Sequence, residues 1–362
     1  MQKLTYHLPH PTHYHQYFLE KLVETNTYNL NIVYYNAILK EYPWKTNFDF
    51  DKQTYVLKKK YINVDFRYLF KKNNSINFVA GWIEPTMIIL LTVWAIFGIP
   101  YIIGTDTIID KNRKGVKQFL RSLWLYKLIL KNAISIVTTG NIAVNKIKSL
   151  PIGDIKIYNY PFVTNLDFFK PISQRQINNE IIFLSSGRLD IKHKGYDIAI
   201  KSFNKLKLNY PTFKFIYKII GVGPDYNNLV SLIEQFNLKN EVELLGWKEA
   251  EDLPSLYNSC DFFIHPSYFD PYPNAVLEAM ACGNIVIASN TAGSALDRII
   301  DNENGFIFNS GDFDSLYDKL KYVIKLEQND IQLIKNEARI TAESWDFNYN
   351  INVLKSITSI YE

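Results

Sequence analysis

The stretch Ile181–Gly195, IIFLSSGRLDIKHKG, decides the fold of this chain. Its apolar first half is typical of a buried strand, and its second half leads through a polar loop into a segment with helical periodicity. On either side, short apolar runs rich in β-branched residues alternate with longer helical segments. This alternation favours parallel sheets whose strands are joined by crossover helices.

The same pattern predicts strands in both halves of the chain. In the first half we expect them at residues 3–6, 30–35, 77–79, 101–104, 134–138 and 156–158. In the second half we expect them at residues 181–185, 214–220, 242–244, 262–264, 285–288 and 306–308. Helices fill most of the gaps, for example residues 195–208, 226–236 and 275–281. The fold class is therefore α/β.

A polar stretch between Thr164 and Glu180 is the expected linker between two domains. The chain has 362 residues, which is long for one domain and suits two. We expect an N-terminal domain over residues 1–165 and a C-terminal domain over residues 170–343. Both are predicted to be doubly wound, Rossmann-like domains that face a central cleft. Ligands of such sheets bind outside the carboxyl ends of the strands, so the loops after the strands are the places to search.

The composition indicates a globular protein from a reducing compartment. Hydrophobic residues make up 47% and charged residues 21% of the chain, and the two cysteines are too few for a disulfide framework. No signal-peptide pattern is visible at the N-terminus. The apolar stretch Thr86–Gly104 is interrupted by Gly98 and Pro100, which favours a buried helix, a turn and a strand over a membrane span. The net charge of +4 is mild. The expected localisation is cytoplasmic, and we expect no nucleic-acid partner.

The positive charge is concentrated in one segment. From Lys111 to Gly153 the sequence contains nine Lys and Arg residues and no Asp or Glu. Apolar residues recur among them at helical spacing. Two interpretations stay open for residues 111–132: a basic amphipathic helix that rests on the inner face of the cell membrane, or a solvated face above a buried stripe.

Three motifs have the residue types of a nucleotide-sugar site. The first follows the strand at 181–185 and contains Gly187, Arg188 and Lys194. Fixed cations there would stabilise the charge that develops on a departing diphosphate, and the N-terminus of the next helix would add to this effect. An ordinary basic loop is the alternative. The second motif, Gly221–Pro224, is a glycine-containing turn after the strand at 214–220.

The third motif places two carboxylates near each other. Asp270 lies in a loop and Glu278 lies on the following helix, within the segment His265–Gly283. If both side chains face the cleft, one can bind the hydroxyls of a sugar and the other the two hydroxyls of a ribose, because a carboxylate has several acceptor sites. Glu278 lies among apolar residues and needs a partner if it is buried.

In combination, these elements resemble the retaining glycosyltransferases of family 4, within the group 1 glycosyltransferases, which have the GT-B fold. Further matches are Leu245–Trp247, Val286–Ser289, Gly293 and Asn304–Phe306, so the resemblance covers Ile181–Asp312. It is weaker in the first half, where the turns at Gly81–Trp82, Gly98–Pro100 and Thr138–Gly140 are comparable. Residues 344–362 look like the segment that crosses back onto the N-terminal domain in GT-B proteins.

The resemblance implies roles for individual residues. Arg188 and Lys194 would bind the donor diphosphate and act in catalysis, Glu278 would bind the ribose, and Asp270 would lie beside the transferred sugar. The other donor-binding residues implied are Gly187, Gly221, Gly223, Trp247, Tyr272, Asn274 and Ala275. The reaction would retain the anomeric configuration, and a nucleotide-diphosphate sugar would be the co-substrate, with no metal or other cofactor.

The sequence departs from the family pattern at several positions. Asp270 replaces the usual glutamate, Pro273 replaces a common glycine, and Thr105–Asp106 replaces a histidine–aspartate pair. On the acceptor side we expect His10, His13, His15, Trp82 and Asp106. The three histidines also permit a zinc site, but no acid or cysteine neighbour completes it, so contact with the acceptor or a role in the loop is the preferred interpretation.

The predicted function is transfer of a sugar to a hydroxyl of a saccharide or lipid-linked saccharide, in cell-surface polysaccharide or glycolipid biosynthesis. Two alternatives stay open. One is a nucleotide-sugar epimerase or hydrolase on the same fold, and the other is a non-catalytic subunit that binds sugar nucleotides. Release of the nucleotide without an acceptor would favour the first alternative, and binding without turnover would favour the second.

Overall fold

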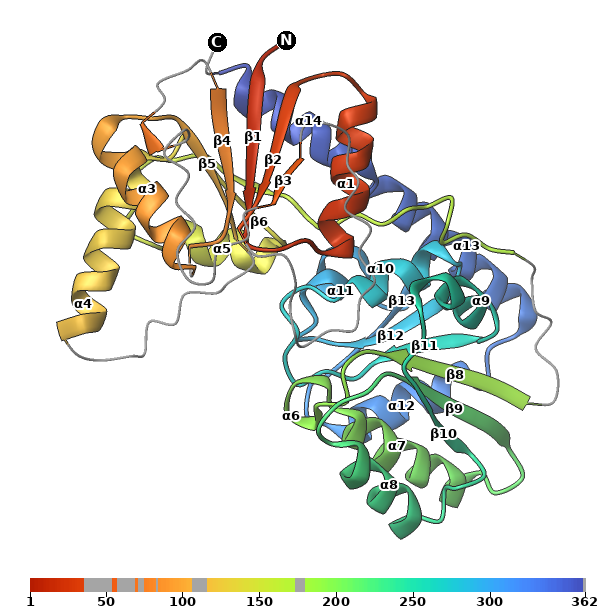
Figure 1. Cartoon of the computed structure of the whole chain (residues 1–362). Helices are drawn as coiled ribbons and strands as arrows, with labels where there is room; N and C mark the ends of the chain where they lie inside the picture. The colour runs from red at the N-terminus through yellow and green to blue at the C-terminus, as the bar shows by residue number, and fades with distance from the viewer. Residues whose placement is uncertain are drawn as a thin grey trace. The chain divides into compact units, whose positions relative to one another are not determined.

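The computed structural model describes residues 1–35, 54–56, 69–70, 75–82, 84–105, 116–172 and 180–360, with the backbone alone for residues 13–14, 54–56 and 116–119. The chain forms two compact units (Figure 1). Unit 1 comprises Met1–Val163 and Phe347–Glu362, and unit 2 comprises Thr164–Asp346. The predicted domain boundaries, at 165–170 and 343–344, fall within a few residues of these divisions.

Unit 1 is built on a parallel sheet with the strand order β3-β2-β1-β4-β5-β6-β7. Its strands are β1 (Lys3–Leu8), β2 (Asn29–Tyr34), β3 (Thr54–Val56), β4 (Ser75–Ala80), β5 (Tyr101–Thr105), β6 (Ser135–Thr138) and β7 (Ile157–Asn159). Its helices are α1 (His13–Glu24), α3 (Pro85–Phe97), α4 (Val116–Leu123), the π-helix η1 (Trp124–Leu130), α5 (Asn141–Lys148) and α14 (Phe347–Thr358).

Helices cover both faces of this sheet, because successive side chains of each strand point to opposite faces. On β5, Tyr101 and Ile103 pack in the core beneath α3 and η1, whereas Ile102 packs in the core beneath α1 and α14. The C-terminal helix α14 is part of unit 1, where Asn350 Nδ2 donates a hydrogen bond of 2.6 Å to the carbonyl of Pro161.

Unit 2 is built on a second parallel sheet with the order β10-β9-β8-β11-β12-β13. Its strands are β8 (Glu180–Ser186), β9 (Lys214–Ile220), β10 (Val242–Gly246), β11 (Phe262–His265), β12 (Ile285–Ser289) and β13 (Gly305–Phe308). Its helices are α6 (Ile191–Lys194), α7 (Tyr196–Asn209), α8 (Tyr226–Gln235), η2 (Ala250–Asp252), α9 (Leu253–Asn258), α10 (Asn274–Ala281), α11 (Gly293–Arg298), α12 (Phe313–Val323) and α13 (Gln328–Ser344).

Two apolar layers sandwich the sheet of unit 2. Residues of α7, α8 and α12 pack on one face, around Phe203 and Leu316. Residues of α10, α11 and α13 pack on the other face, around Val276 and Ala338. This doubly wound arrangement, with parallel strands throughout, confirms the predicted α/β class.

The apolar stretch after Glu84 folds as the expected helix, turn and strand. Pro85 occupies the first turn of α3, and Gly98 ends the helix in the left-handed conformation with φ of 66°. The N–H of Ile99 then donates a hydrogen bond of 2.9 Å to the carbonyl of Trp94. In the described ranges of the chain, no helix has both the length and the hydropathy to cross a bilayer.

Each predicted strand is present, but β3 was not predicted. It has three residues, too few for a periodic pattern to appear. The predicted basic helix at 111–132 is present from Val116 onward as α4 and the π-helical segment η1. Cys260 and Cys282 are unpaired and buried, as the cysteine count predicted.

Candidate active site

The candidate site lies where the strand order of unit 2 changes direction. β8 is flanked by β9 on one side and by β11 on the other, and all three strands run parallel. The loops after β8 and β11 therefore leave the sheet at the same edge and diverge from each other. Such a switch point is where open α/β sheets bind their ligands. The first predicted motif follows β8 and the third follows β11.

Glycines allow the strand-end loops to pack backbone against backbone. A Cβ atom on Gly221 would lie 1.9 Å from the carbonyl oxygen of Gly187, and one on Gly195 would lie 2.0 Å from that of Pro266. Gly195 also has a φ of 63°, which L side chains rarely adopt. The loops are thus locked together, and the backbone N–H of Tyr268 donates a hydrogen bond of 2.9 Å to the carbonyl of His193.

Gly221 and Gly223 therefore pack against the backbone of the loop that follows β8. A Cβ atom on Gly223 would lie 2.4 Å from the carbonyl oxygen of Leu189, and the Leu189 N–H donates a hydrogen bond of 3.0 Å to the carbonyl of Val222. Both glycines face the loop that carries Arg188 and Lys194. Their role in this structure is to let that loop approach β9 closely.

A buried ion pair joins the first and third motifs. Lys194 Nζ, at the end of α6, donates a hydrogen bond to Asp270 Oδ2, in the loop after β11. The exposed fraction is 24% for the lysine side chain and 11% for the aspartate side chain. Burial by itself would raise the pKa of Asp270, but the hydrogen bond from His265 and the Lys194 ammonium hold it far below its ordinary value. Asp270 is therefore a carboxylate throughout the physiological range.

His265 makes a second hydrogen bond to the carboxylate of Asp270. It ends β11, is 3% exposed, and its Nε2 lies 3.0 Å from Asp270 Oδ2. A carboxylate only accepts hydrogen bonds, so Nε2 carries the proton and donates. Burial lowers the pKa of His265 despite the neighbouring carboxylate, so the ring is neutral at pH 7.

Glu278 lies on α10 and accepts a hydrogen bond from a tyrosine of the preceding helix. Tyr257 of α9, which is fully buried, donates from its hydroxyl to Glu278 Oε2 at 2.8 Å. Burial raises the pKa of Glu278 to about 7, although the hydrogen bond from Tyr257 acts in the opposite direction. The sequence predicts that Glu278 needs a polar partner if it is buried. That partner is the hydroxyl of Tyr257, which is neutral, and not a cation.

Helix α11 holds the loop that carries Asp270. The Gly293 N–H donates to the Asp270 carbonyl at 3.0 Å, and Ser294 Oγ donates to the Pro273 carbonyl at 2.6 Å. A Cβ atom on Gly293 would lie 1.9 Å from the carbonyl oxygen of Pro271. The loop thus follows the surface of α11 from Asp270 to the start of α10.

A stacked arginine completes this support. The guanidinium of Arg298 lies 5.0 Å from the ring centre of Tyr272 and 4.9 Å from that of Trp345. Arg298 is 3% exposed, and its Nε and Nη2 have no hydrogen-bond partner among the described residues. Tyr272 was predicted to bind the donor, but it is 6% exposed and covered by Arg298. Its role in donor binding stays a prediction.

The other predicted donor residues are spread around the same edge. Arg188 is exposed in the loop after Gly187. Asn274 and Ala275 form the first turn of α10 and are half-buried, so their backbone N–H groups lie at the positive end of the helix dipole. Trp247 follows β10, and its buried indole N–H has no hydrogen-bond partner in the described part of the chain.

The predicted acceptor-side residues have different environments in unit 1. His13 and His15 lie in the first turn of α1 rather than in a loop, and Thr12 Oγ1 accepts from the His15 N–H at 3.3 Å. Burial lowers the pKa of His15 to about 4, and burial also lowers that of His10. Trp82 is 3% exposed and packs in the core beneath α3, and its contact with an acceptor stays a prediction. Asp106 lies outside the described residues.

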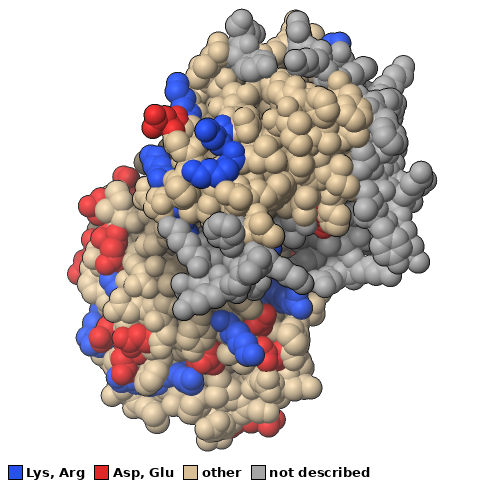
Figure 2. Space-filling view, turned by 90° about the vertical axis from the view of Figure 1, so that its left-hand side faces the viewer, with Lys and Arg blue, Asp and Glu red and all other residues tan. Residues whose placement is uncertain are grey.

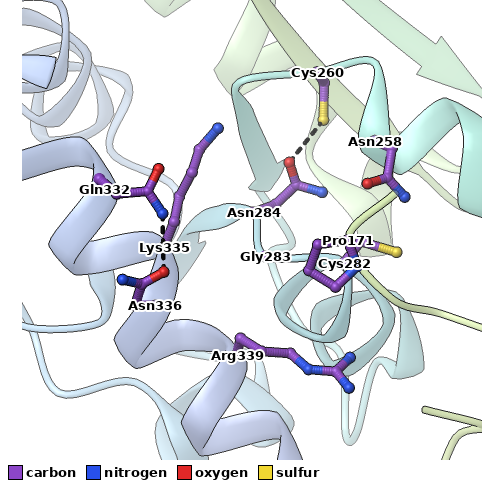
Figure 3. Close-up of a pocket in the computed structure, with 10 residues that line it drawn as sticks. All are labelled: Pro171, Asn258, Cys260, Cys282, Gly283, Asn284, Gln332, Lys335, Asn336 and Arg339. Atoms are coloured by element: carbon purple, nitrogen blue, oxygen red, sulfur yellow. Dashed lines mark hydrogen bonds between the residues drawn. The ribbon is translucent and has the colours of Figure 1, made fainter. Parts of the chain in front are cut away.

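The described residues hold no group of three His, Cys, Asp or Glu side chains arranged for a metal ion. A cavity of about 100 Å³ lies between α13 and the segments that precede β11 and β12 (Figure 3). Because Cys260 and Asn284 come immediately before those strands, the cavity is at the amino edge of the sheet, opposite to Asp270. It is also small for a drug-sized ligand, whose sites usually have 300 Å³ or more.

Part of the chain matches the model of a known protein family. Residues 168–340, just under half of the chain, match the family model for glycosyl transferases group 1. The putative colanic acid biosynthesis glycosyltransferase WcaL of Escherichia coli (strain K12) is 28% identical over 190 residues, 51% of this chain and 45% of that protein.

A second relative has a more specific name. The N-acetylgalactosamine-N,N'-diacetylbacillosaminyl-diphospho-undecaprenol 4-alpha-N-acetylgalactosaminyltransferase of Campylobacter jejuni is 30% identical over 165 residues. These residues are 45% of this chain and 42% of that protein. The matching parts thus span less than half the length of both relatives.

Solved structures are similar over the whole chain. A sucrose-phosphate synthase from Thermosynechococcus elongatus matches with a TM-score of 0.74 at 15% identity and covers 99% of both chains. HepE from Anabaena, solved in complex with UDP, matches with a TM-score of 0.72 at 15% identity and covers 99% of this chain and 100% of that one. At these identities the similarity shows the fold. Residues 168–340 thus match the family model for glycosyl transferases group 1, and the chain has the two-domain α/β GT-B fold.

Proposed function

We propose that this chain is a retaining glycosyltransferase of family 4 that moves a sugar from a nucleotide-diphosphate donor to a hydroxyl of a saccharide. The observation that carries the proposal is the convergence of Lys194, Asp270 and His265 at the switch point of unit 2, beside the helix that bears Glu278. The family match over residues 168–340 and the names of the relatives support it.

The charges of the site fit the departure of a diphosphate. In the proposed reaction the bond between the anomeric carbon and the diphosphate oxygen breaks. The acceptor oxygen bonds to the same face of that carbon, and its proton passes to the leaving diphosphate. Lys194 and Arg188 would stabilise the negative charge that develops on the leaving group. Asp270 is ionised and so does not donate a proton; it orients Lys194 and accepts hydrogen bonds from sugar hydroxyls.

Glu278 would bind the ribose of the donor. A carboxylate accepts hydrogen bonds from two neighbouring hydroxyls at once, and Tyr257 contacts the Oε2 oxygen of Glu278 rather than Oε1. The N-terminal turn of α10, with Asn274 and Ala275, would face the diphosphate, where backbone N–H groups favour an anion. We propose no metal cofactor, because lysine and arginine supply positive charge where a divalent cation would otherwise act.

The experiment is a donor screen with matched variants. UDP-, GDP- and ADP-sugars are incubated with saccharide and lipid-linked saccharide acceptors, and released nucleotide and the anomeric configuration of the product are measured. Lys194→Met should lower kcat by about 100- to 1000-fold, whereas Lys192→Met, an exposed lysine two residues away, should not. EDTA should leave the rate unchanged.

Each outcome separates the alternatives. Release of nucleotide at the same rate without an acceptor would identify a hydrolase or epimerase, and tight donor binding without turnover would identify a non-catalytic subunit. An inverted product would refute the retaining mechanism. A Lys194→Met protein that is folded and fully active would remove the site assignment.

The acceptor is proposed as a lipid-linked saccharide of a cell-surface polymer. The Campylobacter jejuni relative is named for a diphospho-undecaprenol substrate, and WcaL for the biosynthesis of colanic acid. An acceptor with a lipid anchor would keep the enzyme in the cytoplasm at the inner face of the cell membrane. The basic segment at residues 111–132 is the proposed point of peripheral contact.

A further inference from the structure

Arg298 of α11 is a buried cation that is only partly hydrogen-bonded. Figure 2 shows Lys and Arg side chains at the surface, many of them next to Asp or Glu side chains, which is the usual place for a charge. Arg298 Nη1 donates to the carbonyl of Ser294 at 3.3 Å, whereas Nε and Nη2 have no partner within the described residues. Buried polar groups are nearly always paired, and the exceptions are concentrated where function requires them.

Two aromatic rings hold the guanidinium where hydrogen bonds do not. Its carbon lies 5.0 Å from the ring centre of Tyr272 and 4.9 Å from the ring centre of Trp345. Both distances are within the range of about 6 Å over which a cation is attracted to an aromatic ring, and the attraction is strongest away from water. Tyr272 follows β11 and Trp345 follows α13, so Arg298 joins two segments that are far apart in sequence.

The first of these segments carries Asp270. Tyr272 lies two residues after Asp270, whose carboxylate pairs with Lys194. Pro271 and Pro273 flank Tyr272, and a proline fixes its own φ and restricts the residue before it. Residues 270–273 therefore have few soft torsions. A displacement of the Tyr272 side chain is passed along the backbone to Asp270 because little of it is absorbed between them.

The second segment is the place where the chain leaves unit 2. Helix α13 ends at Ser344, unit 2 ends at Asp346, and α14 begins at Phe347. Trp345 caps α13 with a non-helical backbone, with φ of −109° and ψ of 38°. Residues at the ends of elements are typical places for a chain to change direction between domains. Arg298 thus fixes Trp345 to unit 2 immediately before that point.

We propose that Arg298 is a positioning residue for sugar transfer, which ties the loop that carries Asp270 to the segment at Trp345 where the chain leaves unit 2. The inference rests on the proposed function and deepens it. Without the cation, the loop and Trp345 move independently, and Asp270 no longer holds Lys194 beside the leaving group. A displacement of about 1 Å at a catalytic group is enough to lower a rate about 100-fold.

The first test compares Arg298→Met with Arg298→Lys in the transfer assay. Arg298→Met should lower kcat about tenfold and change the KM for the donor less than about threefold, because Lys194 stabilises charge that develops only in the transition state. Arg298→Lys keeps a cation beside the rings and should regain most of the lost kcat. Thermal melting of each variant separates a loss of kcat from a loss of folded protein.

Hydrogen exchange is a second test that does not depend on activity. It is measured on the unliganded full chain for the loop at residues 268–274. Arg298→Met and Trp345→Leu should each speed exchange in this loop at least about threefold. The double variant should exchange no faster than either single variant, because both changes remove the same link. Trp345→Leu tests the link from the other ring and stays informative if Arg298→Met does not fold.

Lys205→Met is the matched control. It removes a cation that lies 4.6 Å from the ring centre of Tyr317 in the same unit, and it should change neither kcat nor exchange in the loop. Three results would overturn the proposal: wild-type kcat and exchange in Arg298→Met, additive effects of Arg298→Met and Trp345→Leu, or a lower kcat without faster exchange.

Failure of the proposed function has a different signature. A wild-type chain that turns over no nucleotide sugar refutes the proposed function, and the exchange data then still decide whether Arg298 holds the loop. Wild-type turnover that Arg298→Met leaves unchanged refutes the positioning role alone.

Discussion

Replacing Glu278 by glutamine tests the electrostatics of the candidate site directly. Burial raises the pKa of this carboxyl from 4.5 to about 7. The folded protein therefore keeps a proton that the unfolded chain loses near pH 4.5. The resulting stabilisation is fully present below about pH 4.5 and is lost as the pH rises through 7.

The size of the effect follows from the two pKa values. One pKa unit corresponds to about 1.4 kcal/mol, so the difference between 4.5 and 7 amounts to about 3 kcal/mol. This is an upper limit, because Glu278 keeps some accessible surface. Between pH 5 and pH 8 the free energy of unfolding of the wild type should fall by up to about 2.5 kcal/mol relative to Glu278→Gln. Glutamine accepts the same hydrogen bond from Tyr257 and does not titrate.

The assay is urea unfolding at pH 5, 6, 7 and 8 for three proteins. Glu303→Gln, an exposed residue of the same type, serves as the control and should follow the wild type at every pH. The affinity for UDP is measured at the same pH values. If the ribose requires the ionised carboxylate, wild-type affinity should rise about tenfold between pH 6 and pH 8, and that of Glu278→Gln should stay weak and flat. Parallel unfolding curves for the wild type and Glu278→Gln would refute the reasoning.

Three other predictions concern the support of the site. Gly221→Ala should lower the free energy of unfolding by more than about 2 kcal/mol, because its Cβ would lie 1.9 Å from the Gly187 carbonyl oxygen. Gly153 also has a positive φ but has open space around it, so Gly153→Ala should lower the free energy of unfolding by about 1 kcal/mol. Equal losses for the two variants in urea unfolding would rule out the close approach at Gly221. Tyr257→Phe should move the pH midpoint of UDP binding upward, because it removes a hydrogen bond that lowers the pKa of Glu278; an unchanged midpoint would contradict this. Arg298→Met should leave the free energy of unfolding within about 1 kcal/mol of the wild type or above it. Methionine keeps the packing against Tyr272 and removes the two buried nitrogens, Nε and Nη2, that have no hydrogen-bond partner among the described residues. A decrease of more than about 3 kcal/mol would show that the cation is needed.

The sheets were predictable from local sequence patterns. A buried parallel strand such as Ile285–Ser289 is an almost continuous apolar run, and Gly98 and Pro100 mark the end of a helix by their backbone conformation alone. β3 was missed because three residues do not form a pattern. The change from α-helix to π-helix at Trp124 was also missed, since no local signal for it is visible in the residues.

The candidate site was predictable in part. Lys194, Asp270 and Glu278 could be named because their residue types and spacing fit the chemistry. Their hydrogen-bond partners could not be named, since Tyr257 lies on a different helix from Glu278 and reaches it only in the folded chain. Tyr272 and Trp82 were placed at binding surfaces by their positions in motifs, but packing buries them.

The sequence by itself determined the elements, the two doubly wound sheets and the motif-bearing loops, because strand and helix periodicity and glycine conformation are local properties of the chain. Only the tertiary structure decided which charges meet. The pairing of Lys194 with Asp270, the proton donated by His265 and the raised pKa of Glu278 depend on the order of β8 and β11 and on burial. Both arise when segments distant in sequence exclude water from the same place.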